Sequence, residues 1–271
     1  VTDLIAAEAI RWIEGRGTAP FFLYVPFTAV HLPVKEPTEW LQRVPPKITG
    51  DVARHYAASV MHLDDAVGRI VVALDMKGVR KNTMLVFTSD NGGSTAENND
   101  LKYPDDHCPN GKLPGNNKPW RGEKGELYEG GTRVPTIVSW PGQAKPGSVN
   151  SPVQITDWMP TFCSITGYKM DRDLKWDGTN IAALLADHRP LPDRPLYAVA
   201  PNFRSRSLRH GQWKLIVFEN GKTIKRIELF DMDVDPIESS NVAEKHPIHV
   251  ERLLMELETA AARDRDAEAV N

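Results

Sequence analysis

The chain has 271 residues, of which 41% are hydrophobic and 25% are charged, and its formal net charge is -3. This length allows one large globular domain, or a large domain with a small one attached. There is no basic excess that would indicate nucleic acid as a partner, and the apolar runs are too short to span a membrane. The two cysteines, Cys108 and Cys163, form neither a disulfide framework nor a zinc pattern, and the sequence leaves open whether they are bonded to each other.

The chain begins with Val1 and opens directly in a helix-like stretch over residues 2–14. No charged segment followed by an apolar one, as in a signal peptide, stands before this stretch. We therefore expect a processed chain or a fragment of a longer protein.

The first part of the chain alternates strand and helix patterns. Residues 21–27, FFLYVPF, are a continuous apolar run that predicts a buried strand. Apolar residues at steps of three and four over 51–76 predict a long amphipathic helix that ends at Gly78. Residues 83–88 predict the next strand, and the order strand, helix, strand is typical of an α/β fold.

The middle of the chain contains a long aperiodic segment at residues 91–120, rich in Gly, Pro, Asn, Asp and Lys. Loops of this length in compact domains are usually functional or mobile. Beyond it the pattern predicts a strand at 134–140 and helices around 157–165 and 178–186.

The chain changes character after about residue 195. Asn220-Gly221 between two apolar runs predicts a hairpin. A final helix is predicted at 246–263, with four apolar side chains facing the body of the protein: Ile248, Leu253, Leu254 and Leu257. We therefore predict two domains, an α/β domain at residues 1–195 and a small antiparallel sheet with one helix at 196–271.

The stretch TSDNGG at residues 88–93 ends the second predicted strand with polar side chains and glycines. Ligands of open α/β sheets collect at the carboxyl ends of strands, and the oxygens of Asp90 and Asn91 suit Ca²⁺ or Mg²⁺. Taken alone, Asn-Gly after a strand is more often a plain turn. His31 behind the first predicted strand and Lys124 in RGEKG are, each alone, also more often ordinary residues.

Several motifs occur in series along the chain: PFFLYVPFTAVHLP at 20–33, HYAASVMHLDDAVGRI at 55–70, VFTSDNGG at 86–93 and PWRGEKGELYEGGTRVPTIVSWPG at 119–142. SLRHGQWKLIVF at 207–218 and ELFDMDVDPIESSNVAEKHP at 228–247 follow them. This series resembles the sulfatases of the alkaline-phosphatase-like superfamily, in particular the arylsulfatase and N-acetylgalactosamine-6-sulfatase branch. The resemblance covers nearly the whole chain and implies a mixed sheet flanked by helices, with a small C-terminal antiparallel sheet.

The resemblance implies a role for each candidate site residue. It implies that Asp90 and Asn91 bind a divalent cation, usually Ca²⁺, and that Lys124 binds the sulfate oxygens. It further implies that His31 contacts the sulfate and the ester oxygen and helps to protonate the leaving group. The implied substrate is a sulfated carbohydrate or an aryl sulfate.

The sequence departs from the family at the nucleophile. Sulfatases make a formylglycine from a cysteine or serine in C/S-x-P/A-x-R, and this sequence has no such motif. Two oxygen donors are also too few for Ca²⁺, which takes roughly six to eight. We therefore expect a partial chain that binds Ca²⁺ weakly, is inactive alone, and exposes a sheet edge for a complementary N-terminal sulfatase segment or a second copy.

Two alternatives remain open at this stage. One is a phosphate or phosphonate ester hydrolase of the same superfamily, since the pocket chemistry is similar. The other is a non-catalytic remnant that serves as a binding module, which the absent nucleophile motif favours. By resemblance, the expected location is the periplasm, the cell exterior or a lysosome.

Overall fold

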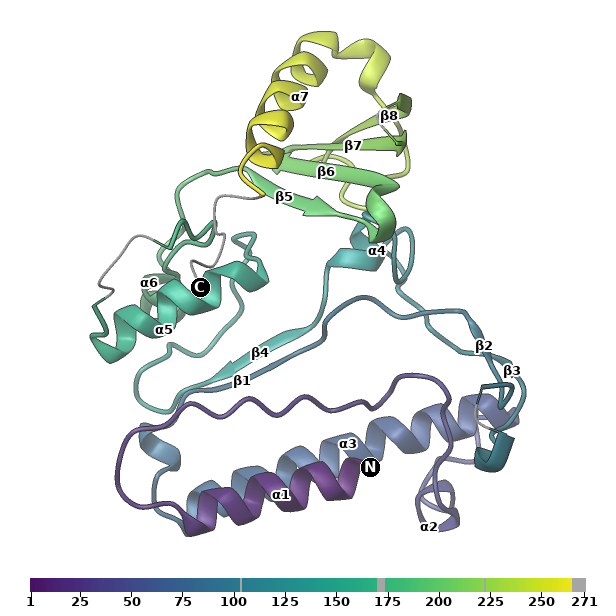
Figure 1. Cartoon of the computed structure of the whole chain (residues 1–271), viewed down its shortest axis with the longest axis vertical. Coiled ribbons are helices and arrows are strands. Elements are labelled where there is room, and N and C mark those ends of the chain that lie inside the picture. The colour runs from purple at the N-terminus through teal and green to yellow at the C-terminus, as the bar shows by residue number, and fades with distance from the viewer. Residues whose placement is uncertain (103, 170–173, 222, 265–271) are drawn as a thin grey trace. The chain divides into compact units, whose positions relative to one another are not determined.

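The computed structural model describes residues 1–102, 104–169, 174–221 and 223–264 (Figure 1). The chain divides into two compact units, which are described separately. Unit 1 comprises Val1–Leu85 and Gly93–Asn116, and unit 2 comprises Val86–Gly92 and Asn117–Asn271. These units are defined by how compactly the chain packs. The domain border predicted between residues 195 and 196 is based on a change in sequence pattern, and it stays a prediction.

Two long helices, α1 (Thr2–Gly15) and α3 (Asp51–Met76), form the core of unit 1. Ala9 and Ile13 of α1 pack against Ile70, Ala73 and Leu74 of α3. Alanines on both helices are buried at this contact, and their small side chains allow the two helix backbones to approach closely. Helix α3 ends as predicted at Gly78, whose φ of 74° suits the left-handed position after a helix.

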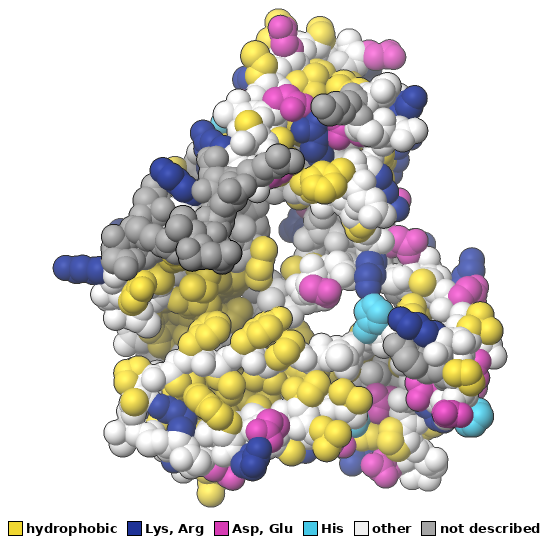
Figure 2. All heavy atoms as spheres, in the orientation of Figure 1, with side chains coloured by type: hydrophobic (Ala, Val, Ile, Leu, Met, Phe, Trp, Pro, Cys, Tyr) yellow, Lys and Arg dark blue, Asp and Glu magenta, His cyan; other side chains and the backbone are white. Residues whose placement is uncertain are grey.

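The prediction of a buried strand at residues 21–27 is wrong. The segment is extended but pairs with no other strand among the described residues. Phe21, Leu23, Val25 and Phe27 pack on the α1 and α3 core, whereas Tyr24 on the other face is 75% exposed. Figure 2 shows apolar side chains gathered over this part of unit 1. The physical reason is that an extended segment can bury the side chains of one face against helices without any backbone pairing. A β-strand additionally needs backbone hydrogen bonds to an adjacent strand.

The long segment after the second predicted strand contains short elements of its own. Strands β2 (Glu97–Asn98) and β3 (Gly111–Lys112) pair, and the 3-10 helix η2 (Pro104–Asp106) lies between them. The buried Asn98 side chain accepts a hydrogen bond from Val34 N at 2.6 Å and donates one to Pro109 O at 2.7 Å. This segment is therefore anchored to the stretch that follows His31. The remaining short helices of unit 1 are α2 (Thr38–Leu41) and η1 (Arg80–Asn82).

Unit 2 contains most of a two-stranded sheet made of β1 (Leu85–Thr88) and β4 (Thr136–Ser139), at the positions predicted. The predicted helices are also present, as α5 (Trp158–Thr166) after η3 (Ile155–Asp157), and as α6 (Ala182–Asp187). Cys163 of α5 and Cys108 of unit 1 are both free thiols, which answers the question that the sequence left open.

The C-terminal part of unit 2 is a four-stranded antiparallel sheet in the order β5–β6–β7–β8. The strands are β5 (Leu196–Val199), β6 (Ser205–His210), β7 (Trp213–Asn220) and β8 (Thr223–Asp231), and Asn220 pairs with Thr223 at the predicted hairpin. The 3-10 helices η4 (Pro201–Phe203) and η5 (Ala243–Lys245) lie in its connections.

Helix α7 (Pro247–Ala261) covers one face of this sheet. Leu253 and Leu257 are fully buried against Leu208, Leu215 and other apolar side chains of the strands. The prediction that Ile248 faces the body is wrong, because this side chain is 78% exposed. It lies in the first turn of the helix, ahead of the residues that reach the sheet.

Candidate active site

The turn that follows β1 carries Asp90 and Asn91. Ser89 Oγ donates a hydrogen bond to Asn91 O at 2.9 Å, and Asn91 Nδ2 donates one to Gly92 O at 2.8 Å. These bonds fix the turn and leave the amide oxygen of Asn91 as its acceptor. Asp90 is exposed, and its carboxylate forms no ion pair within the described part of the chain.

This turn touches the loop at residues 121–132, here called the Lys124 loop. Gly92 N donates a hydrogen bond to Gly131 O at 3.0 Å, and Gly130 N donates one to Arg121 O at 2.7 Å. A Cβ at Gly92 would lie 1.8 Å from Gly130 O, and a Cβ at Gly130 would lie 2.3 Å from Gly122 O. Only glycine allows backbones to approach so closely. The motifs SDNGG and GEKGELYEGG, distant in the sequence, thus meet in unit 2.

Lys124 lies at an exposed turn of this loop. Gly122 and Gly125 on either side have φ values of 84° and 87°, which glycine adopts without steric cost. Glu126 folds back and its carboxylate accepts a hydrogen bond from Glu123 N at 3.0 Å. The ammonium is therefore presented from a turn whose backbone is held by internal bonds.

The second face of the C-terminal sheet supports the Lys124 loop. Leu127 and Tyr128 are buried against Ile216, Phe230 and Met232 of that sheet and its following turn. Because side chains alternate along a strand, Leu215 and Val217 face α7 while Lys214 and Ile216 face the loop.

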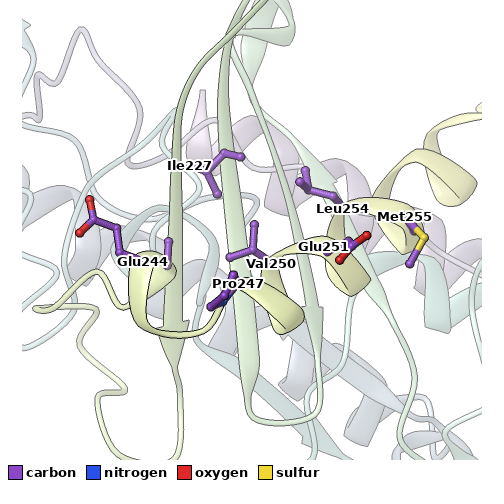
Figure 3. Close-up of a pocket in the computed structure, with 8 residues that line it drawn as sticks. Ile227, Glu244, Pro247, Val250, Glu251, Leu254 and Met255 are labelled. Atoms are coloured by element: carbon purple, nitrogen blue, oxygen red, sulfur yellow. The ribbon is translucent and has the colours of Figure 1, made fainter.

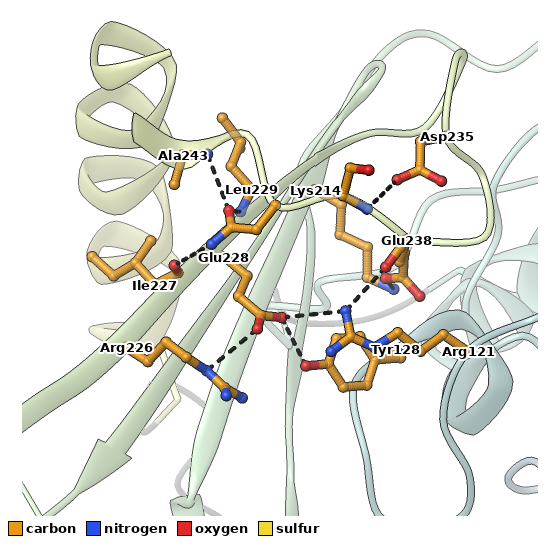
Figure 4. A network of polar contacts seen from close by, with 12 residues as sticks. Arg121, Tyr128, Lys214, Arg226, Ile227, Glu228, Leu229, Asp235, Glu238 and Ala243 are labelled. Atoms are coloured by element: carbon orange, nitrogen blue, oxygen red, sulfur yellow. Dashed lines mark hydrogen bonds and ion pairs between the residues drawn. The ribbon is translucent and has the colours of Figure 1, made fainter. Parts of the chain in front are cut away.

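Figure 4 shows the polar contacts on this face, with the Glu228 carboxylate between Tyr128 and two arginines. Tyr128 OH donates a hydrogen bond to Glu228 Oε2 at 2.7 Å, and the Arg121 guanidinium lies 4.0 Å from the centre of the Tyr128 ring. Burial, together with the Glu228 carboxylate, raises the pKa of Tyr128 well above its ordinary value. The phenol therefore stays protonated and acts as a structural donor.

His31 belongs to unit 1, where it is exposed. Its Nδ1 lies 2.6 Å from Leu32 O, and since a carbonyl can only accept, Nδ1 carries the proton. Nε2 then carries the lone pair of the neutral ring. The structure brings Asp90, Asn91 and the Lys124 loop together in unit 2, and the approach of His31 to them stays a prediction.

Among the described residues there is no group of three or more His, Cys, Asp or Glu side chains that could hold a metal ion. Asp90 and Asn91 supply oxygen donors, which fit a hard divalent cation in kind but not in number.

Sequence reasoning missed the residues beneath the site, Lys214 and Glu238. Lys214 is 4% exposed and Glu238 is fully buried, and both contact Glu129 of the Lys124 loop. Lys214 lies inside the apolar run WKLIVF. A lysine within such a run is the signal in the sequence that could have indicated a buried, paired ammonium.

The groove in Figure 3 lies elsewhere, between α7 and β8, and has a volume of about 530 Å³. Glu244 and Glu251 are its charged lining residues, so it would repel a sulfate ester. No helix among the described residues is long and apolar enough to cross a membrane.

The mixed α/β fold with a C-terminal four-stranded antiparallel sheet is the alkaline-phosphatase-like fold, which solved structures similar to this chain share. The sequence model described as "Sulfatase" matches residues 1–168, more than half of the chain. The chain belongs to the sulfatase family. A second model, described as "N-sulphoglucosamine sulphohydrolase, C-terminal", matches residues 121–265.

Two curated relatives illustrate the similarity. A sulfatase from Formosa agariphila is 34% identical over 211 residues, which cover 71% of this chain and 35% of that protein. The N-acetylgalactosamine-6-O-sulfatase from Bacteroides thetaiotaomicron is 28% identical over 281 residues, which cover 97% of this chain and 51% of that protein. The chain thus spans about half the length of these relatives, or less.

The crystal structure of Ps i-CgsB in complex with k-i-k-neocarrahexaose resembles the chain with a TM-score of 0.83 and 27% identity. The match covers 99% of this chain and 56% of that chain. Nearly every element of this chain therefore has a counterpart in a solved structure whose chain is almost twice as long.

Proposed function

We propose that this chain supplies part of the active site of a sulfuric ester hydrolase. The observation that carries the proposal is the backbone contact between Gly92 and Gly131, because it joins the Asp90–Asn91 turn to the Lys124 loop. In this proposal Lys124 binds the sulfate oxygens, Asp90 and Asn91 hold a divalent cation, and His31 acts at the ester oxygen.

The chemistry requires these types of side chain. Cleavage of a sulfate monoester moves negative charge onto the leaving oxygen and leaves charge on the remaining sulfate oxygens. An ammonium fixed in advance stabilises that charge in a site shielded from water. In its imidazolium form, with Nδ1–H bonded to Leu32 O, the His31 ring can give the proton on Nε2 to the leaving group and is left as the neutral ring.

The cation would be Ca²⁺, with Mg²⁺ as the other candidate, and it would supply Lewis-acid stabilisation of the sulfate oxygens. Asp90 and Asn91 would supply only part of its coordination. A formylglycine would have to come from a C/S-x-P/A-x-R motif, which these 271 residues do not contain. We therefore propose that the chain alone has no sulfatase activity.

The proposed substrate is a sulfated sugar. Two similar proteins point to it, the N-acetylgalactosamine-6-O-sulfatase at 28% identity and the structure bound to k-i-k-neocarrahexaose at 27%. We further propose that a complementary sulfatase segment pairs with residues 21–27, because about half of each relative has no counterpart here. The proposed location, outside the cytoplasm, rests on the family resemblance alone.

A titration of the nitrogen-15-labelled chain with inorganic sulfate, followed by NMR, tests the anion site. We expect saturable shifts of the amides of Lys124, Gly125 and Gly92. Lys124→Met should abolish them, whereas Lys145→Met, which removes an exposed lysine elsewhere in unit 2, should not. Equal shifts in the Lys124→Met variant would refute the assignment.

The same titration separates the alternatives. Inorganic phosphate or methylphosphonate binding more tightly than sulfate at Lys124 would favour a phosphate or phosphonate ester hydrolase. A chimera in which this chain replaces the matched half of the Bacteroides enzyme tests catalysis. Turnover of an aryl sulfate by the chimera but not by the isolated chain supports the proposal, and turnover by the isolated chain contradicts it.

A further inference from the structure

The Lys124 loop contains little regular structure that could hold its shape. Its single helix, α4 (Glu129–Thr132), is four residues long, and several of its positions are glycines. Glycine-rich segments lose more conformational freedom on ordering than others do. The fixed position of this loop must therefore come from contacts with neighbouring elements.

The strongest of these contacts is a buried group of three charges. Lys214 Nζ lies 2.8 Å from Glu129 Oε1 and 2.8 Å from Glu238 Oε1. The three side chains are 5%, 8% and 0% exposed, respectively. The second carboxylate oxygen of Glu238 accepts a hydrogen bond from the backbone N–H of Glu129 at 2.6 Å. Glu129 is thus held at both its side chain and its backbone.

Each member of this group comes from a different part of unit 2. Glu129 opens α4 of the Lys124 loop, Lys214 lies on β7, and Glu238 lies in the turn after β8. Arg121 NH1 adds a hydrogen bond to Glu238 O at 3.0 Å, and Arg204 bonds to Gly125 O, next to Lys124. The C-terminal sheet and its connections therefore bind the loop at Arg121, Gly125 and Glu129, which lie at its start, middle and end.

The balance of charge makes Lys214 the critical member. A buried ion is costly unless it is paired, and here one ammonium serves two carboxylates. Burial raises the pKa of Glu238, while the Lys214 ammonium opposes that effect. Arg133 lies 3.7 Å from Glu129 Oε2 but is half-exposed, so it cannot replace a buried cation. Without Lys214, two carboxylates would face each other in the interior.

We propose that Lys214, together with Glu129 and Glu238, is a positioning group that fixes the Lys124 loop in its anion-binding shape. None of the three is proposed to touch the substrate, so they act through the loop. The anion-binding part of this inference rests on the proposed function, whereas the fixing of the loop rests on the geometry alone. The C-terminal sheet is then a support for the sulfate-binding loop.

Hydrogen exchange of the whole 271-residue chain, resolved by residue, tests the fixing of the loop. In Lys214→Met we expect the amides of Glu129, Gly130 and Gly131 to exchange roughly tenfold faster or more, while Leu215 and Ile216 in β7 keep their protection. Lys225→Met, the same change at an exposed position of β8, should alter neither set. The dissociation constant for inorganic sulfate should rise roughly fivefold in Lys214→Met.

A double variant separates positioning from general destabilisation. Lys214→Met with Glu238→Gln removes the repulsion between carboxylates and keeps an acceptor for Glu129 N, so loop protection and sulfate affinity should partly recover. Unchanged loop exchange in Lys214→Met would overturn the proposal, as would equal acceleration in the loop and in β7. If the unmodified chain binds no sulfate, the proposed function fails, and the exchange data still decide the role of Lys214.

Discussion

Gly92 N donates a hydrogen bond to Gly131 O at 3.0 Å, and this bond joins two turns that lie far apart in the sequence. The first turn carries Asp90 and Asn91, and the second closes the loop of Lys124. The first turn has no room for a Cβ at the contact, because Gly130 O lies 1.8 Å from where the Cβ of residue 92 would be. Gly92 is therefore needed for the contact between the turns, whereas Cβ atoms at Gly130 and Gly131 would collide with the backbone of the Lys124 loop itself.

Replacing Gly92 by alanine should disrupt this contact. The obstructing atoms belong to the backbone of Gly130 and cannot rotate away, so we expect Gly92→Ala to lower the free energy of unfolding of unit 2 by about 2 to 3 kcal/mol. Gly68→Ala is the matched control, because residue 68 lies within α3 with nothing near its Cβ position. Urea unfolding should show the control to be slightly stabilised. An unaffected Gly92→Ala variant would mean that the turns separate easily.

Asp157 is expected to be a major contributor to the stability of unit 2. It is fully buried, accepts hydrogen bonds from Arg194 at 2.7 and 2.5 Å, and also accepts one from Thr179 N at 2.8 Å. Asp157→Asn leaves the Arg194 guanidinium without a counter-charge, so the free energy of unfolding should fall by about 3 kcal/mol.

The control for Asp157 is an ion pair of the same type on the surface. Asp187 and Arg189 lie 2.9 Å apart, with side chains 59% and 70% exposed. Asp187→Asn should change the free energy of unfolding by about 0.5 kcal/mol or less. Chemical denaturation that gave similar losses for Asp157→Asn and Asp187→Asn would contradict the role assigned to burial.

His55 should make unit 1 less stable in mild acid. Burial lowers its pKa from the ordinary 6.5, although the charge of Asp51 opposes this, and Nδ1 accepts a hydrogen bond from Glu36 N at 2.8 Å. The unfolded chain then takes up a proton at a higher pH than the folded chain. The contribution of neutral His55 to the free energy of unfolding is therefore fully present above pH 6.5. It is lost as the pH falls through the lowered pKa of His55 in the folded chain.

Urea unfolding followed by tryptophan fluorescence can measure this effect, because Trp12 and Trp40 lie in unit 1, where Trp40 stacks on His62. The loss of stability between neutral and mildly acidic pH should be larger in the unmodified chain than in His55→Gln, which cannot titrate. Identical pH profiles for the two proteins would show that His55 is not responsible.

The exposed face of residues 21–27 should promote association of the isolated chain. Phe22 and Tyr24 are 67% and 75% exposed on an extended segment that pairs with no strand among the described residues. Sedimentation velocity should detect self-association, and Phe22→Ser with Tyr24→Ser should weaken it by roughly tenfold.

The control for this association carries substitutions at equally exposed apolar residues on helices. Leu4 and Met76 are 74% and 85% exposed on α1 and α3. Leu4→Ser with Met76→Ser should leave the association constant nearly unchanged. If both pairs of substitutions weakened self-association equally, the association would be nonspecific and hydrophobic, and it would not occur through the extended segment.

Patterns that depend on nearby residues were predicted well. Helix α3 with its terminal glycine, strands β1 and β4, and the hairpin at Asn220 lie where the sequence predicts them. Asp157, predicted to start a helix, completes a capping box with Gln154. Each of these features depends on side chains only a few positions apart.

Predictions that required knowledge of the neighbours were less successful. Residues 21–27 have the composition of a buried strand, but they join no strand ladder among the described residues, and their apolar side chains cover the helices instead. Ile248 fits the apolar pattern of α7 but lies in the turn before the helix reaches the sheet. Composition alone does not show what lies next to a segment.

By itself, the sequence determined the family, the order of most elements and the chemical types at the candidate site, because motifs and periodicity are local properties of a chain. Only the tertiary structure decided which distant segments meet. It brought Gly92 against Gly130 and Gly131, and it placed Lys214 between Glu129 and Glu238. The physical reason is that a buried ammonium and its carboxylates are stable only as a group, and the fold assembles that group from segments whose local sequences do not predict the pairing.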